Sequence, residues 1–286
     1  MFIITGATGH TGSAAAQALL AAGKQVRVVV RAAAKAERLK ALGAEVFVAD
    51  LADQAALARA VRGAEGVFFM SPPDLTATDF TGERRRLTQR QVDTLTAAHV
   101  PHVVLLSSTG AQHAAGTGAI LSLHNAEQQL RASGLPATFV RAGYFLENWG
   151  SVVHPVKTDG VLPSFTPAGL RMPTVSVADI GKAVAQALID GPRGGVRVIE
   201  LSGPQDLSPN DVAAAFSRIL GKPVKVVEAP LDAVVPTFTS FGMSENVAGL
   251  FREMYEAMTR GLITTEPGEH VRGTTPLETT LRALLG

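Results

Sequence analysis

The stretch Thr5-Gly6-Ala7-Thr8-Gly9-His10-Thr11-Gly12 decides the fold of this chain. It follows the apolar run at residues 2–5 and precedes alanine- and leucine-rich sequence that is typical of a helix. Glycines at such a turn let the backbone approach a pyrophosphate, and the helix start offers free N–H groups to its oxygens. The spacing is Gly-x-x-Gly-x-x-Gly, and a glycine-rich turn without a ligand is the alternative. Because a strand precedes it and a helix follows, we predict nucleotide contacts from Gly6, Thr8, Gly9, His10, Thr11 and Gly12.

Short apolar runs alternate with longer helical stretches from residue 1 to about residue 141. The runs are rich in Val, Phe and Ile, which is typical of strands buried on both faces of a parallel sheet. They are residues 2–5, 26–30, 46–48, 66–70, 103–106 and 138–141, and the helical stretches are residues 11–22, 33–42, 54–61, 82–98 and 119–132. This alternation predicts right-handed crossovers and an α/β fold with a doubly wound parallel sheet.

The rhythm changes after residue 150, where prolines and glycines break the chain into loops and short strands. Residues 176–188 then indicate a helix, and residues 197–201 indicate a strand. Ser208 and Thr275 are each followed by a proline and, two residues later, by an acid. This pattern predicts that both residues are helix N-caps.

The composition limits the kinds of partner. Among 286 residues, 26 Lys and Arg stand against 25 Asp and Glu, and a net charge of +1 gives no excess that would attract nucleic acid or a membrane surface. No cysteine is present, which excludes thiol chemistry. The length fits one large domain or two unequal ones, and the patterns divide the chain into a nucleotide-binding domain at residues 1–150 and a smaller α/β region at residues 151–286, interleaved with the first. Without a long apolar run or a signal-peptide pattern, we expect a cytoplasmic protein.

The end of the second predicted strand indicates which nucleotide is bound. NAD-binding folds place an Asp or Glu about 20 residues past the glycines to hold the ribose 2′-hydroxyl. Here Arg31 follows the strand, and Lys35 lies four residues further on. A guanidinium at this position suits a 2′-phosphate, so we predict that Arg31 and Lys35 select NADPH over NADH. An ordinary exposed arginine at a helix start is the alternative.

Two further pairs of residues end predicted strands at the carboxyl edge, where ligands of open α/β sheets collect. Asp50 and Leu51 follow the third strand and are candidates for contacting the adenine, although Asp50 suits a helix start equally well. Ser71 and Pro72 follow the fourth strand. Extended backbone at these two residues would run beside the ribose and the diphosphate of the cofactor.

The motifs taken together resemble the NmrA-like family, whose members are atypical short-chain dehydrogenases/reductases. Besides the glycine loop and Asp50-Leu51, the shared motifs are Ser107-Ser108-Thr109-Gly110, His124-Asn-Ala-Glu127, Ser133-Gly134-Leu135-Pro136, Arg141-Ala-Gly143, Glu147-Asn148, Val175-Ser-Val-Ala-Asp179-Ile-Gly and Arg272-Gly-Thr-Thr-Pro-Leu277. The resemblance spans nearly the whole chain. It implies that residues 1–150 are a Rossmann-type domain that binds NADP(H) and that residues 151–286 are a small substrate-binding region. It also implies either a reductase of dyes, quinones or isoflavone-type compounds, or a regulator that senses NADP(H) without turnover.

The chain lacks the Tyr-x-x-x-Lys pair of standard short-chain dehydrogenases, in which the lysine lowers the pKa of the tyrosine. The sequence holds two tyrosines, and the residue four positions on is Asn148 after Tyr144 and Thr259 after Tyr255. A nicotinamide can still deliver hydride where the protein orients it against an acceptor and excludes water. We therefore expect a conjugated acceptor, such as a quinone, an azo compound or a cationic dye, that takes its proton later from solvent.

Polar and aromatic residues near the expected nicotinamide position complete the site prediction. His124 matches a histidine of the resemblance and is a candidate proton donor, since imidazole titrates near neutral pH; a structural histidine is the alternative. Ser107 and Ser108 end the fifth strand, where they either contact the nicotinamide side or merely end the strand. After the sixth strand we predict a catalytic Tyr144 and an acceptor pocket floored by Phe145, Asn148 and Trp149, the alternative being an aromatic core.

Other clusters carry less information. His99 and His102 are separated by a proline and have no carboxylate beside them, so no metal site is expected. The basic run at residues 83–86 predicts a solvated helix face, and Met254 with Tyr255 predicts a core stripe, a substrate mouth being the alternative. We predict an NADPH-dependent reductase of a quinone or similar acceptor, as a monomer or homodimer. A non-catalytic NADP(H) sensor that binds a partner protein is the alternative.

Overall fold

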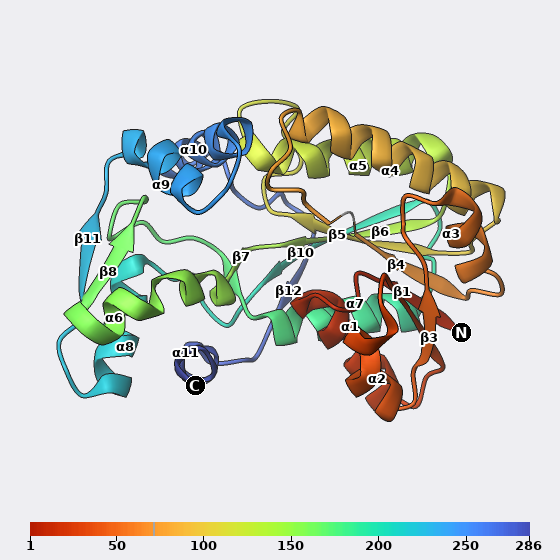
Figure 1. The fold of residues 1–286 in the computed structure, drawn as a ribbon, viewed down its shortest axis with the longest axis horizontal. Helices are drawn as coiled ribbons and strands as arrows, with labels where there is room; N and C mark the ends of the chain where they lie inside the picture. Colours follow the sequence, from red (N-terminus) through yellow and green to blue (C-terminus); the bar gives the residue numbers. More distant parts are fainter. Residues whose placement is uncertain (71) are drawn as a thin grey trace.

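The molecule is built on an open parallel sheet with helices on both faces (Figure 1). The computed structural model describes residues 1–70 and 72–286, and eight strands of these residues form the main sheet in the order β12-β10-β6-β5-β4-β1-β2-β3. All neighbouring strands are parallel. The direction of winding reverses between β1 and β4, as in a Rossmann-type fold, so a ligand site is expected at the carboxyl ends of these two strands.

Seven strands of the main sheet lie where the apolar runs predict them, and the eighth, β12, lies where no run was predicted. They are β1 (Phe2–Thr5), β2 (Val26–Val30), β3 (Glu45–Val48), β4 (Gly66–Phe69), β5 (Val103–Ser108), β6 (Ala137–Ala142), β10 (Val196–Ser202) and β12 (Glu269–Arg272). Neighbouring residues of one strand enter different cores: Ile4 packs in the core beneath α1 and α7, and Ile3 packs in the core beneath α4 and α5. Burial on both faces explains the continuous apolar runs.

Two sets of helices cover the sheet (Figure 1). One face carries α1 (His10–Ala21), α2 (Glu37–Ala41) and α7 (Val177–Asp190), and the other carries α3 (Gln54–Ala60), α4 (Phe80–Ala97) and α5 (Leu121–Ser133). The helix predicted at residues 33–42 is a 3₁₀ turn, η1 (Ala33–Ala36), followed by α2, and η2 (Gly118–Ile120) precedes α5. None of the helices formed by the described residues is long and apolar enough to cross a membrane.

A smaller unit lies beyond the carboxyl ends of β6 and β10, which lead into it (Figure 1). Two strand pairs belong to it, β7 (Tyr144–Phe145) with β9 (Thr174–Val175) and β8 (Val161–Ser164) with β11 (Lys225–Glu228). Its helices are η3 (Leu146–Val152), α6 (Val153–Asp159), α8 (Pro209–Leu220), η4 (Leu231–Ala233), α9 (Val234–Ser240), α10 (Glu245–Thr259) and α11 (Leu277–Leu285). The chain after residue 150 is interleaved with the main sheet, because α7, β10 and β12 return to it.

One predicted helix cap is confirmed and the other is wrong. Ser208 caps α8, and Asp211 accepts the Ser208 backbone N–H at 2.9 Å in return. Thr275 does not cap α11, which has Pro276 at its N-cap position. The Thr275 N–H instead donates to Oδ2 of the buried Asp179 at 2.8 Å. A carboxylate from α7 therefore holds this segment, a long-range contact that the local pattern does not contain.

His102 is a structural histidine inside the sheet. It is fully buried, and its Nε2 lies 3.0 Å from the Thr138 hydroxyl. Burial, helped by the positive charge of Arg197, lowers the pKa of His102 to about 4 from an ordinary value of 6.5. Below pH 6.5 the unfolded chain therefore binds a proton that the folded protein excludes until about pH 4.

We expect the protein to lose stability as the pH falls from 6.5 towards 4, and His102 to contribute about 3 kcal/mol of that loss. Urea unfolding at several pH values measures it. The His102→Gln protein should show a shallower dependence of unfolding free energy on pH, whatever its absolute stability. His154→Gln, at an exposed position on α6, is the control and should keep the wild-type slope. Equal slopes for all three proteins would contradict the assignment.

Candidate functional site

The glycine loop between β1 and α1 is held by contacts that require glycine. Gly6 has φ +63°, in the left-handed region, and its carbonyl accepts the N–H of Gly9 at 3.0 Å. A Cβ on Gly12 would lie 2.4 Å from the same carbonyl oxygen, so α1 packs directly on the loop backbone. The Thr5 hydroxyl donates to the Phe68 carbonyl at 2.9 Å. These contacts fix the loop at the carboxyl ends of β1 and β4.

The N-terminus of α1 is open to a ligand. Thr8, Gly9 and His10 are exposed, and within the described chain no side chain caps this helix and no acid lies in its first turn. Its first N–H groups and the positive end of its dipole are therefore available to an anion. Thr11, which is also a predicted contact, is buried in the first turn of α1.

Two basic residues, Arg31 and Lys35, follow β2 at the carboxyl edge of the sheet. β2 pairs with β1 with Val29 opposite Thr5, so Arg31, which follows β2, emerges beside the start of the glycine loop. Lys35 lies on η1. Both side chains are exposed, and neither forms an ion pair with any residue that the structure describes. This is where a phosphate on the 2′-position of a bound ribose would need cations.

The loops after β3 and β4 border a hollow of about 310 Å³. Asp50 is exposed and its Oδ1 accepts the Ala52 N–H at 2.8 Å, Leu51 is half-buried, and Pro72 is exposed. The predicted contact Ser71 lies outside the described residues. The hollow is lined by Ala52, Pro72, Asp74, Ala77, Phe80, Glu83, Arg84, Arg86, Leu87 and Arg90. Apolar walls beside arginines suit a planar ring that carries phosphate groups.

His124 and the two serines at the end of β5 lie on the β4 side of the glycine loop, opposite to the side of β2 and Arg31. His124 is half-buried, and its Nδ1 lies 2.9 Å from the Ala111 carbonyl oxygen. Since a carbonyl only accepts, Nδ1 carries the hydrogen and Nε2 is left to interact with a ligand. The buried Ser107 donates to Oε1 of Glu127 at 2.6 Å, and Ser108 donates to the Thr109 carbonyl at 2.9 Å. A contact from Ser107 to a ligand would require it to leave Glu127.

Ser107 belongs to a buried network of charged residues, and the sequence analysis did not predict that these residues lie together. Arg141 on β6 binds Glu127 of α5 through two hydrogen bonds of 2.8 and 2.7 Å, and it also pairs with Glu200 of β10 and with Glu266. The register places Arg141 opposite both Ser107 and Glu200. Burial raises the pKa of Glu200. Among the described residues no group of His, Asp or Glu is arranged to hold a metal ion.

The residues predicted to floor the acceptor pocket point in different directions. Tyr144 and Trp149 pack together with ring centres 5.8 Å apart, and Trp149 lies in the apolar core of the smaller unit with 7% of its surface exposed. Phe145 packs against the core beneath α1 and α7. Asn148 is exposed. Tyr144 and Asn148 therefore remain candidates for touching a ligand, while Phe145 and Trp149 pack in apolar cores, in agreement with the alternative of an aromatic core.

Glu147 is a polar residue that the site prediction missed. Its Oε1 accepts the Val177 N–H at 2.9 Å, at the start of α7. Its Oε2 is buried and has no hydrogen-bond partner among the described residues. Burial raises the pKa of Glu147, and the proximity of His10 in the glycine loop opposes that rise. A buried carboxylate oxygen beside the loop fits a bound group with hydroxyls or N–H donors. The sequence did contain an indication of this residue, because Glu147 is a carboxylate shortly after the Arg141-Ala-Gly143 motif that ends the sixth strand.

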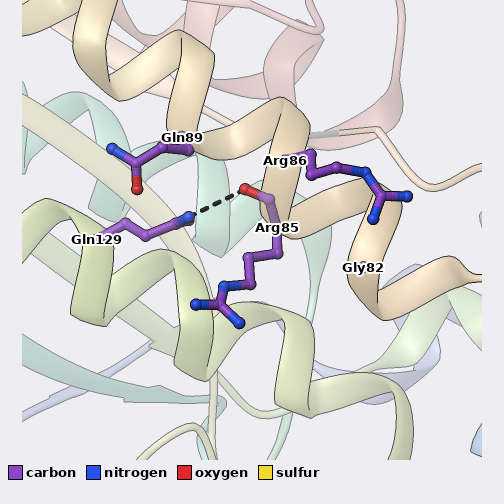
Figure 2. A pocket seen from close by; sticks show the side chains of 5 residues that line it. All are labelled: Gly82, Arg85, Arg86, Gln89 and Gln129. Atoms are coloured by element: carbon purple, nitrogen blue, oxygen red, sulfur yellow. Dashed lines mark hydrogen bonds between the residues drawn. The ribbon is translucent and has the colours of Figure 1, made fainter.

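A separate surface hollow of about 340 Å³ lies between α4 and α5 (Figure 2). Gly82, Arg85, Arg86, Gln89 and Gln129 line it, and Gln129 donates to the Arg85 carbonyl at 2.9 Å. The arginine side chains are exposed. Arg85 and Arg86 of the basic run are solvated, as predicted, whereas Arg84 is half-buried with its guanidinium 5.3 Å from the centre of the Phe80 ring. This hollow shares no residue with the glycine loop.

Comparisons with known proteins agree with this architecture. The model of the NmrA-like family matches residues 1–271. NAD(P)H azoreductase of Xenophilus azovorans is 28% identical over 89% of this chain and 86% of its own length. The (4-alkanoyl-5-oxo-2,5-dihydrofuran-3-yl)methyl phosphate reductase of Streptomyces griseus subsp. griseus is 32% identical over 82% and 78%. Quinone oxidoreductase 2 of Escherichia coli is 26% identical over 91% and 89%.

Two solved structures share the fold across most of their length. Triphenylmethane reductase of a Citrobacter species, solved with NADP(H), superposes with a TM-score of 0.83 at 21% identity over 99% of both chains. Nmra, a negative transcriptional regulator, superposes with a TM-score of 0.71 at 22% identity over 91% of this chain and 83% of its own. One fold therefore accommodates both a reductase and a regulator.

We expect Gly12→Ala to abolish dinucleotide binding, because the new methyl group would displace α1 from the Gly6 carbonyl and move the phosphate-facing N–H groups. Titration with NADPH and NADH, followed by nicotinamide fluorescence, measures the change. The control is Gly169→Ala, where a Cβ meets no atom within 4 Å. That variant should bind as the wild type does. Unchanged affinity in Gly12→Ala would show that this loop does not hold the cofactor.

Proposed function

The chain belongs to the NmrA-like family, and we propose that it is an NADPH-dependent reductase that transfers hydride to a quinone or a related conjugated acceptor. The observation that carries the proposal is the glycine loop, in which Gly6 and Gly12 hold an uncapped helix start beside the exposed Arg31 and Lys35. Three relatives that are named reductases or an oxidoreductase, each aligned over most of both chains, support it.

The residues around the loop fit the cofactor along its whole length. Backbone N–H groups of the loop and of α1 would hold the diphosphate, and Arg31 with Lys35 would hold the 2′-phosphate. The hollow lined by Ala52 and Pro72, after β3 and β4, would take the adenine, with Asp50 and Leu51 preceding Ala52 in the chain. Glu147, through its unpartnered oxygen, would accept a hydrogen bond from the ribose or carboxamide at the nicotinamide end. When bound, NADPH supplies a hydride from its nicotinamide ring.

The acceptor side carries polar groups but no lysine-activated tyrosine. His124 keeps its ring fixed through Ala111 and presents Nε2. Tyr144 has a pKa raised by burial, so it stays protonated and donates hydrogen bonds instead of exchanging protons. Such a site orients a planar acceptor and excludes water, while the proton that completes reduction comes from solvent. Acceptors whose charge is delocalised over a ring system suit it best.

A regulator that senses NADP(H) and binds a partner protein is the second candidate. The observation in its favour is the lack of a Tyr-x-x-x-Lys pair, since Asn148 and Thr259 occupy the lysine positions after the two tyrosines. The structural likeness to Nmra is consistent with it. A sensor needs the cofactor site alone, whereas the reductase also needs the acceptor side described above.

We expect the purified protein to oxidise NADPH in the presence of at least one member of a panel of naphthoquinones, azo dyes, triphenylmethane dyes and enones. Loss of nicotinamide absorbance measures turnover. His124→Ala is expected to lower kcat, because Nε2 no longer holds the acceptor. Tight NADPH binding without turnover of any acceptor would favour the sensor instead.

Removal of the cation after β2 should change the cofactor preference. We expect Arg31→Ala to weaken NADPH binding by about 10- to 100-fold and to leave NADH binding unchanged, since only NADPH carries a 2′-phosphate. Dissociation constants for both cofactors measure the effect. Arg62→Ala, an exposed arginine after α3 that precedes β4 at the opposite end of the sheet, is the matched control. Equal losses for both cofactors would contradict the role given to Arg31.

A further inference from the structure

The two tyrosines of the chain meet in the folded protein. Tyr144 lies on β7 and Tyr255 lies on α10, and their phenol groups are hydrogen-bonded to each other. The side chain of Asn148 is also hydrogen-bonded to Tyr144. Burial raises the pKa of both phenols, that of Tyr255 to about 12. Both hydroxyls are therefore neutral donors at physiological pH.

The Tyr144 phenol is hydrogen-bonded on one side to the Asn148 side chain and on the other to the Tyr255 phenol. A phenol oxygen can accept a hydrogen bond while its own O–H donates another, and the O–H rotates to suit its surroundings. The Tyr255 hydroxyl can therefore accept from Tyr144 and turn its own hydrogen towards a ligand. Hydrogen bonds in series strengthen the final donor.

The packing of α10 brings this helix against the segment that leads to His124. A Cβ on Gly118 would lie 2.0 Å from the Leu250 carbonyl oxygen and 2.7 Å from the Met254 nitrogen, so α10 rests on the backbone of η2. η2 leads directly into the first turn of α5, which carries His124. Tyr255 follows Met254, and Tyr144 lies just past the carboxyl end of β6.

Aromatic rings pack around the Tyr255 side chain. The ring of Phe165 lies 5.5 Å from that of Tyr255, and the ring of Phe238 lies 6.2 Å from it. Phe238 also packs edge-on against Phe251 at 5.2 Å. All of these side chains are half-buried. In a chain with only 5% aromatic residues, such a cluster around a polar hydroxyl suits a flat ring that carries an oxygen.

We propose that the Tyr255 hydroxyl, positioned by Tyr144 and Asn148, donates a hydrogen bond to the carbonyl oxygen of a quinone-type acceptor and stabilises the negative charge that develops there. This inference rests on the proposed reductase function. Hydride, which is one proton and two electrons, passes from NADPH to the quinone and yields NADP⁺ and the hydroquinone monoanion. A proton from water then gives the hydroquinone. Tyr255 keeps its own proton throughout and acts as an oxyanion donor.

The test compares two acceptors that differ in whether hydride addition creates a negative charge. Hydride addition to 1,4-naphthoquinone creates an oxyanion, whereas addition to the central carbon of malachite green removes a positive charge and creates none. Tyr255→Phe is expected to lower kcat with the quinone by about 100-fold and to leave kcat with the dye unchanged. Tyr144→Phe and Asn148→Ala should lower the ratio of the quinone rate to the dye rate, and by less than Tyr255→Phe does. Thr259→Val removes an exposed hydroxyl from the same helix and should change neither rate.

A binding measurement gives a readout that does not depend on turnover. The complex with NADP⁺ is titrated with 4-nitrophenolate, which presents an aromatic oxyanion, and with nitrobenzene, which presents none. Tyr255→Phe should weaken only the phenolate. Parallel losses with both acceptors or both ligands would show a structural role and overturn the inference, as would wild-type values throughout. A wild-type protein that reduces neither acceptor would instead contradict the proposed reductase function.

Discussion

The contact between the backbone of Gly12 and the carbonyl of Gly6 positions far more than the glycine loop, because it sets where α1 lies. α7 in turn rests on α1 so closely that a Cβ on Gly181 would lie 2.5 Å from the Cβ of Ala14. The start of α7 then receives Glu147, and Asp179 in its first turn holds the segment before α11. A series of close contacts therefore connects the phosphate-facing end of the molecule with the last helix.

Much of the main sheet could be predicted from local pattern. Its strands are buried on both faces, so hydrophobic runs alone indicated strands β1 to β6 and β10. The start of α8 was predicted from a local capping box at Ser208. The cofactor end of the candidate site also follows from local rules, since a strand, a glycine turn and a following helix define it. The sequence was sufficient to predict those features whose conformation is determined by a single short segment.

The remainder depends on contacts between distant segments. Nothing near Thr275 in the sequence indicates that Asp179 takes its N–H, and nothing near Tyr144 indicates that Tyr255 lies against it. The same holds for Arg141, whose carboxylate partners come from α5, β10 and the segment before β12. Removing one member of such a buried set would leave a desolvated charge without its partner, so the C-terminal part of the chain is tied to the sheet by electrostatics as well as by packing.

The order of strands also has a consequence for how the protein is made. β6 is buried along its length between β5 and β10, yet β10 is synthesised only after residues 143–195. While those residues emerge from the ribosome, β6 is the open edge of a growing parallel sheet, with an apolar strand and unpaired N–H and C=O groups. Parallel pairing across such a separation is slow, so the nascent chain must either delay folding of its first half or have this edge shielded until β10 arrives.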